Sequence, residues 1–132
     1  MMAISDLNVL LKNMSPELNE GQYVFVSLPL NSDVPWSQTI AAIREQEGWS
    51  IVLEVSLAQR LGFASDYLCS WITLNVNSDL AAIGLTAAFS TALGQAGISC
   101  NVVAGKQHDH IFVPSHQAQL AMECLSQLQR SS

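Results

Sequence analysis

Residues 71–128 change from strand pattern to helix pattern and back in an order that few folds share. Alternating apolar positions mark three strands, apolar positions at helical spacing mark two helices, and turn residues separate them. The predicted elements are, in order, a strand (71–76), a helix (80–95), two strands (98–104 and 108–113) and a helix (115–128). This β-α-β-β-α order is most of a ferredoxin-like β-α-β-β-α-β unit.

The long helix of this unit begins an uncharged stretch that runs from Leu80 to Gly105. Asn77-Ser78-Asp79 precedes it and supplies the residue types that cap helix N-termini. The apolar run is interrupted at Gly94 and Gly97, so it is shorter than the roughly 20 residues that cross a bilayer. We therefore expect a buried helix followed by a buried strand, and no membrane span.

The first half of the chain carries a reduced version of the same order. Residues 22–28 alternate as a strand, residues 39–46 and 49–55 form a hairpin turned at Glu47-Gly48, and residues 56–61 form a short helix. A first helix is expected before Ser15-Pro16, and a loop replaces the long helix. Each half lacks a terminal strand, so we expect the halves to complete one sheet. The prediction is an α+β fold of two halves, residues 1–67 (degenerate) and 68–132.

Charge and composition limit the classes of partner and cofactor that this chain can be expected to bind. Five Lys and Arg against 11 Asp and Glu give a net charge of -6, which disfavours nucleic acid. The hydrophobic content of 49% is enough for a core, so neither a cofactor nor a metal is expected. The N-terminal residues do not resemble a secretory signal, and three widely spaced cysteines favour free thiols, so we expect a cytoplasmic location.

The stretch LTAAFSTALGQAGISCNVVAG, followed by HDHIFVP, resembles the ACT domain family, and residues 14–29 and 44–62 resemble other blocks of it. Within that family the sequence is similar to stand-alone bacterial tandem proteins of unassigned function and, distantly, to the arginine sensor CASTOR. The resemblance implies a ferredoxin-like fold with an antiparallel sheet packed against helices. It also implies association between copies and, in many relatives, an amino acid bound between ACT units.

The predicted ligand site combines residues at matching family positions with groups that suit an amino acid. Free N–H groups at a helix start favour a carboxylate, and an acidic side chain at the head of the third strand can receive an ammonium. Gly84 would let a ligand or a neighbouring backbone come close. The predicted ligand-binding residues are Asn77, Ser78, Asp79, Leu80, Gly84 and Asp109. Helix capping and turn formation are the competing interpretations of the same residues.

Other chemistries remain open at this point. His108 and His110 share a strand face and could hold a metal with a third ligand, and Cys100 beside His110 could form a nucleophilic pair. No second cluster or oxyanion motif supports either, so no catalytic residue is assigned. We expect a non-enzymatic, regulatory protein that binds an amino acid and forms a homodimer or higher oligomer. The alternatives are an assembly module without a ligand, or a small hydrolase or metal protein that uses the His-Asp-His segment.

Overall fold

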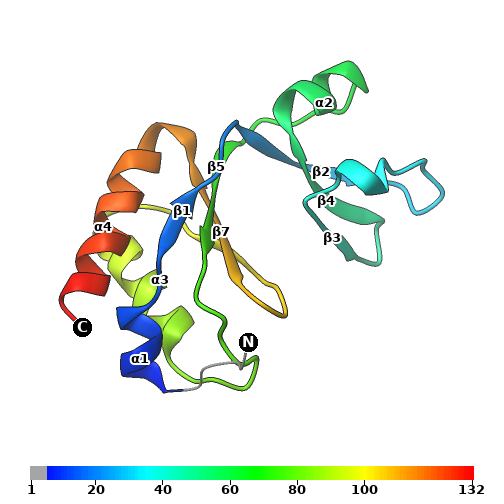
Figure 1. Ribbon diagram of the computed structural model, residues 1–132. Coiled ribbons are helices and arrows are strands. Elements are labelled where there is room, and N and C mark those ends of the chain that lie inside the picture. The colour runs from blue at the N-terminus through cyan, green and yellow to red at the C-terminus, as the bar shows by residue number, and fades with distance from the viewer. Residues whose placement is uncertain (1–5) are drawn as a thin grey trace. The chain divides into compact units, whose positions relative to one another are not determined.

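The computed structural model describes residues 6–132, and these form two compact units. One unit contains residues 21–69, and the other combines residues 6–20 with residues 70–132. Figure 1 labels the four helices and most of the strands, numbered in chain order. The predicted α+β class is confirmed, because the described chain combines antiparallel strand pairs with helices.

The unit of residues 21–69 is built on three antiparallel strands, β2 (Tyr23–Leu28), β3 (Ala41–Arg44) and β4 (Trp49–Glu54). A short helix, α2 (Val55–Arg60), follows β4 directly. A 3-10 turn, η1 (Trp36–Gln38), lies where a complete ferredoxin-like unit would have its first helix. The loop predicted at this place is therefore confirmed.

One face of this small sheet forms its core. The buried residues come from alternate positions of β2 and β4 and from the inner side of α2, as period-two strands dictate. They are Val24, Val26, Leu28, Ile51, Leu53, Leu57 and Ala58. The alternation predicted for residues 22–28 is therefore observed, and Val24, Val26 and Leu28 form the buried face of β2.

The other unit holds the predicted β-α-β-β-α run. Its elements are β5 (Leu68–Leu74), α3 (Leu85–Gln95), β6 (Asn101–Ala104), β7 (Asp109–Pro114), η2 (Ser115–Gln117) and α4 (Ala118–Arg130), preceded in the chain by α1 (Leu7–Lys12) and β1 (Pro16–Leu18). β6 and β7 form the predicted hairpin, in which Ala104 lies opposite Asp109. The apolar sides of α1, α3 and α4 pack with β5 and β7 into one core.

In each unit, one strand comes from the other predicted half of the chain. β1 pairs antiparallel with β5, with Pro16 opposite Leu74, and so adds the strand that residues 68–132 lack. In the other unit, Leu68 and Cys69 at the start of β5 pair antiparallel with Val24 and Tyr23 of β2. β1 was not predicted. The division at residues 67 and 68 stays a prediction about the sequence repeat.

The helix predicted from Leu80 begins later than expected. Residues 77–84 form a loop, and α3 starts at Leu85 with Gly84 as its N-cap residue. Asp79 stabilises a local turn, because its carboxylate accepts the Ala81 N–H at 2.9 Å and its carbonyl accepts the Ala82 N–H at 2.9 Å. Gly84 then adopts a φ of 104°, which interrupts a right-handed helix. The predicted capping of a helix by Ser78 and Asp79 is therefore wrong.

The helices of the described chain are also short. None within residues 6–132 is both long and apolar enough to cross a membrane.

Candidate functional site

A small cavity lies beside the N-terminus of α3, within the unit that contains β5 to β7. Its volume is about 140 Å³. The lining comes from the 77–84 loop, the first turn of α3 and the facing ends of the β6–β7 hairpin: Ser78, Asp79, Leu80, Ala82, Gly84, Leu85, Thr86, Ala104 and Asp109. The cavity therefore brings the continuous segment 78–86 together with residues 104 and 109 of the hairpin.

The structure brings most of the predicted ligand-binding residues to this cavity. Ser78, Asp79, Leu80, Gly84 and Asp109 line it. Asn77 is half-buried and does not line the cavity. Binding of a ligand by these residues stays a prediction, but their common location is a fact of the fold.

Asp109 is the most unusual group in the lining. It is only 8% exposed. Within residues 6–132 no hydrogen bond or ion pair reaches its carboxylate, and since no fully buried side-chain oxygen there lacks a partner, the carboxylate oxygens are accessible from the open volume of the cavity. Burial raises its pKa above the ordinary value, and the neighbouring His110 lowers it to a smaller extent. A buried carboxylate without a partner is destabilising, so a cationic group placed in the cavity would be stabilised there.

The start of α3 also lines the cavity. This helix has 11 residues, and its N-cap residue, Gly84, offers no side chain to its first N–H groups. The first intrahelical bond runs from the Ala88 N–H to the Gly84 carbonyl, so the N–H groups of Leu85 and Thr86 have no partner within the helix. There is also no acidic residue in the first turn. Free N–H groups and the helix dipole together favour an anion.

Gly84, which lines the cavity, also lies close to a side chain of α1. A Cβ built on it would lie 3.0 Å from Cδ2 of Leu7 in α1, and its φ of 104° is one that other residues rarely adopt. A side chain therefore approaches Gly84 where a ligand or a backbone was expected. Substitution at this position would strain the backbone, so it cannot test ligand access cleanly.

Several lining residues were missed by sequence reasoning. Leu85 and Thr86 were placed inside a helix because its start was predicted too early. Ala104 lies opposite Asp109 in the observed hairpin, whereas the turn predicted at residues 105–107 would have placed it opposite His108. The 77–84 loop also carries two exposed apolar side chains, Leu80 at 68% and Ile83 at 85% exposure.

The His-Asp-His segment lies at the start of β7, with His108 just before the strand and Asp109 and His110 within it. Nδ1 of His110 accepts a hydrogen bond from Nε1 of Trp71 at 3.0 Å and lies 3.3 Å from Oγ1 of Thr73. His108 lies with Nδ1 3.4 Å from the Val76 carbonyl. Residues 6–132 contain no group of three His, Cys, Asp or Glu side chains arranged to hold a metal. Burial also raises the pKa of Cys100 to about 11, which disfavours a thiolate nucleophile.

The His110 contacts predict a pH dependence of stability. Burial first, and then the charge of His108, lower the pKa of His110, while Asp109 opposes them. As the pH falls below about 6.5, His110 is therefore protonated in the unfolded chain before it is protonated in the folded chain. The free energy of unfolding should decrease as the pH falls through this range. Urea titrations at pH 7.5 and pH 5.5 measure the change. His110→Gln should reduce it, and an unchanged pH dependence in that variant would contradict the assignment.

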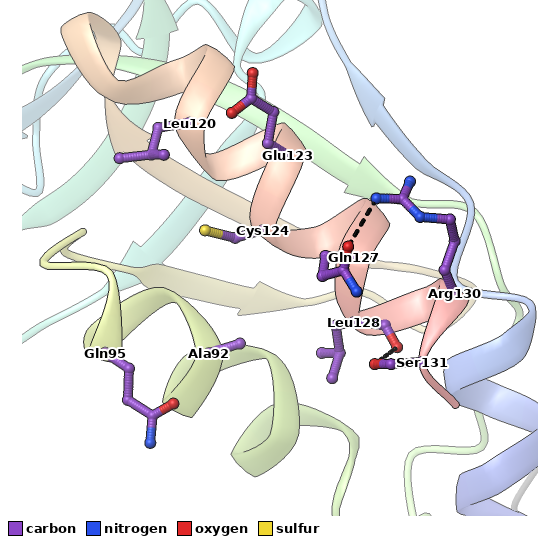
Figure 2. Close-up of a pocket in the computed structure, with 9 residues that line it drawn as sticks. All are labelled: Ala92, Gln95, Leu120, Glu123, Cys124, Gln127, Leu128, Arg130 and Ser131. Carbon is purple, nitrogen blue, oxygen red and sulfur yellow. Dashed lines mark hydrogen bonds between the residues drawn. The ribbon is translucent and has the colours of Figure 1, made fainter.

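A larger groove lies elsewhere on the same unit. Its volume is about 640 Å³, and it runs between α3 and α4 (Figure 2). No residue of the predicted ligand site lines it. It lacks a buried, unpartnered charge, so the smaller cavity is the better candidate for a small charged ligand.

Comparisons with known proteins agree with the architecture. ACT domain models match residues 2–70 and 67–127. The structure of a protein of unknown function from Vibrio cholerae, described as a possible transport protein, is 47% identical in sequence, with a TM-score of 0.82 over 93% of this chain and 95% of that chain. No curated protein matches the sequence.

More distant structures share the fold. A protein from Agrobacterium tumefaciens is 18% identical, with a TM-score of 0.67 over 86% of this chain and 87% of that one. The ligand-free regulatory subunit of aspartate kinase from Thermus thermophilus is 10% identical, with a TM-score of 0.64 over 88% and 97% of the two chains. At this level of identity the likeness concerns the fold, which is that of tandem ACT domains.

Proposed function

Because the chain belongs to the ACT domain family, we propose that it is a non-catalytic regulatory protein that binds a small amino acid in the cavity between Asp109 and the start of α3. The family and the regulatory subunits that share its fold support a regulatory role of the amino-acid-binding type. The amino acid and the location of its site are the parts that we add.

The buried, unpartnered carboxylate of Asp109 is the observation that carries this proposal. A free α-amino acid presents an ammonium and a carboxylate separated by one carbon. Asp109 would accept the ammonium, and the N–H groups at Leu85 and Thr86 would donate to the carboxylate. A zwitterion would thus meet a partner of opposite charge at each end of the cavity.

The volume of the cavity restricts the size of this ligand. A cavity of about 150 Å³ in another protein accommodates benzene, which has six non-hydrogen atoms. At about 140 Å³, this cavity suits a ligand of similar size, such as glycine, alanine or serine. A larger amino acid would have to extend its side chain past the loop residues Leu80 and Ala82.

Regulation would depend on a partner outside this chain. Ligand binding can change activity elsewhere only if two states of the protein differ in their affinity for the ligand. We propose that association between copies, expected for this family, is the property that changes. The free thiols of Cys69, Cys100 and Cys124 fit a reducing compartment, which supports a cytoplasmic location.

A thermal-shift screen against the twenty amino acids tests the proposal. At about 100 times its dissociation constant, a bound amino acid should add roughly 2.7 kcal/mol to the free energy of unfolding, which raises Tm measurably. The largest shifts are expected for the smallest amino acids. If no amino acid at millimolar concentration raises Tm, the ligand-binding role fails and an assembly module without a ligand becomes the better description.

A further inference from the structure

The groove between α3 and α4 is built from side chains of both helices. Ala92 and Gln95 come from α3, and Leu120, Cys124 and Leu128 come from α4. Figure 2 shows Leu120 and Cys124 on the side of α4 that faces α3. Leu120 is 43% exposed, although it is a large apolar residue. The groove thus combines apolar side chains with polar and charged ones, among them Glu123 and Arg130.

The outer side of α3 differs from an ordinary solvent-facing helix. Its exposed residues are Thr86, Ala87, Thr91, Gly94 and Gln95. None of them is charged, whereas solvent-facing helix surfaces usually carry charged side chains. All except Gln95 are small, so another helix could approach this surface closely.

The outer side of α4 carries one charge of each sign. Glu123 and Arg130 are both exposed, and both also line a second hollow on the other side of α4. They are seven residues apart, which places them on the same side of the helix about 10 Å from each other along its axis. Arg130 donates to Oε1 of Gln127 at 3.0 Å (Figure 2), and Glu123 makes no ion pair within residues 6–132.

The charges of Glu123 and Arg130 on one α4 are complementary to those on a second α4 that runs in the opposite direction. An antiparallel copy of α4, related by a two-fold axis between Ser126 and Gln127, would place Glu123 of each copy opposite Arg130 of the other. We propose that a second copy of this chain occupies the groove, with the two α4 helices antiparallel and two Glu123–Arg130 ion pairs across the interface. This inference rests on the proposed association of copies and is independent of the ligand cavity.

Charge reversal tests the surface. Sedimentation velocity at micromolar concentration should show a dimer for the wild-type chain. Glu123→Arg and Arg130→Glu each convert two attractive pairs into two repulsive ones, which should weaken dimerisation about thirtyfold, since exposed pairs contribute up to about 1 kcal/mol each. The double variant E123R/R130E restores both pairs and should dimerise within about threefold of the wild type.

Matched controls separate this surface from a general effect of charge. Glu47→Arg and Arg60→Glu make the same changes at exposed positions of the other unit and should leave the dimer intact. Far-UV circular dichroism checks folding. If a reversal unfolds the chain, Glu123→Gln and Arg130→Gln should weaken the dimer to a smaller extent.

The outcomes distinguish this inference from the proposals on which it builds. A wild-type monomer would overturn the proposed association together with this interface. If the wild type is a dimer and the single charge reversals do not weaken it, the proposed interface alone is overturned. The same conclusion follows if the single reversals weaken the dimer but the double variant does not restore it. Amino acid binding near Asp109 should persist in all of these variants.

Discussion

Asp109→Asn is expected to make the ligand-free protein more stable than the wild type. Folding buries this carboxylate without a partner, and burial raises its pKa. The folded chain therefore holds the proton more tightly than the unfolded chain, so stability decreases as the pH rises from about 4 through the folded-state pKa. Above that pKa the charged form bears the desolvation penalty. An isosteric neutral side chain should raise the free energy of unfolding by about 1 kcal/mol.

Urea unfolding at pH 7 measures this gain. Asp79→Asn is the matched control, because it makes the same chemical change at an exposed residue of the same cavity whose carboxylate already accepts the Ala81 N–H. The control should gain no stability. A less stable Asp109→Asn protein would mean that the carboxylate has a stabilising role in the empty cavity, and the argument for a missing cation would fail.

Gly48→Ala is expected to cause the largest loss of stability among the single changes considered. Gly48 closes the β3–β4 hairpin with a φ of 150°, and the Glu45 N–H donates to its carbonyl at 2.8 Å. A Cβ at this position would lie 2.1 Å from the carbonyl oxygen of Leu28 in β2. The clash is with backbone, so the strands would have to move. We expect a loss of about 2 kcal/mol or more.

Gly94→Ala provides the opposite control in the other unit. Gly94 lies in α3, and a Cβ there would meet no atom within 4 Å. Alanine should therefore raise the free energy of unfolding by about 0.5–1 kcal/mol, through its greater helix propensity. If Gly48→Ala unfolds at the same urea concentration as the wild type, the hairpin geometry described for residues 41–54 would be wrong.

Sequence periodicity was a good guide to elements with one buried face. β2, the β3–β4 hairpin and α4 were predicted close to their observed bounds, because alternate or helically spaced apolar residues enter a core in each of them. Asp109 was also found, since the predicted hairpin placed it at the head of β7. These predictions needed only local patterns.

The errors arose where tertiary structure overrides a local pattern. The apolar residues after Asp79 favour a helix, but a local turn and the left-handed Gly84 delay it to Leu85. β1 is three residues long and begins with a proline, so its pairing with β5 gives no sequence signal. Because the start of α3 was predicted too early, the backbone N–H groups of Leu85 and Thr86 could not be placed at the cavity from the sequence.

The same limit applies to the groove between α3 and α4. Its lining comes from two helices whose packing places Ala92 beside residues more than twenty-five positions later in the chain, and no sequence pattern fixes that packing. The exposed, uncharged side of α3 was predicted as part of a buried helix. Burial of that surface by a second copy would reconcile the pattern with the structure.

Calorimetric titration tests the central claim most directly. The amino acid that gives the largest thermal shift should bind the wild-type protein and an Asp33→Asn control with similar affinity, because Asp33 is an exposed aspartate of the other unit. Asp109→Asn should bind it at least tenfold more weakly, because a hydrogen bond to a charged group contributes about 1.5–3 kcal/mol. An Asp109→Asn protein that binds this amino acid as tightly as the wild type would contradict the account and place the site elsewhere.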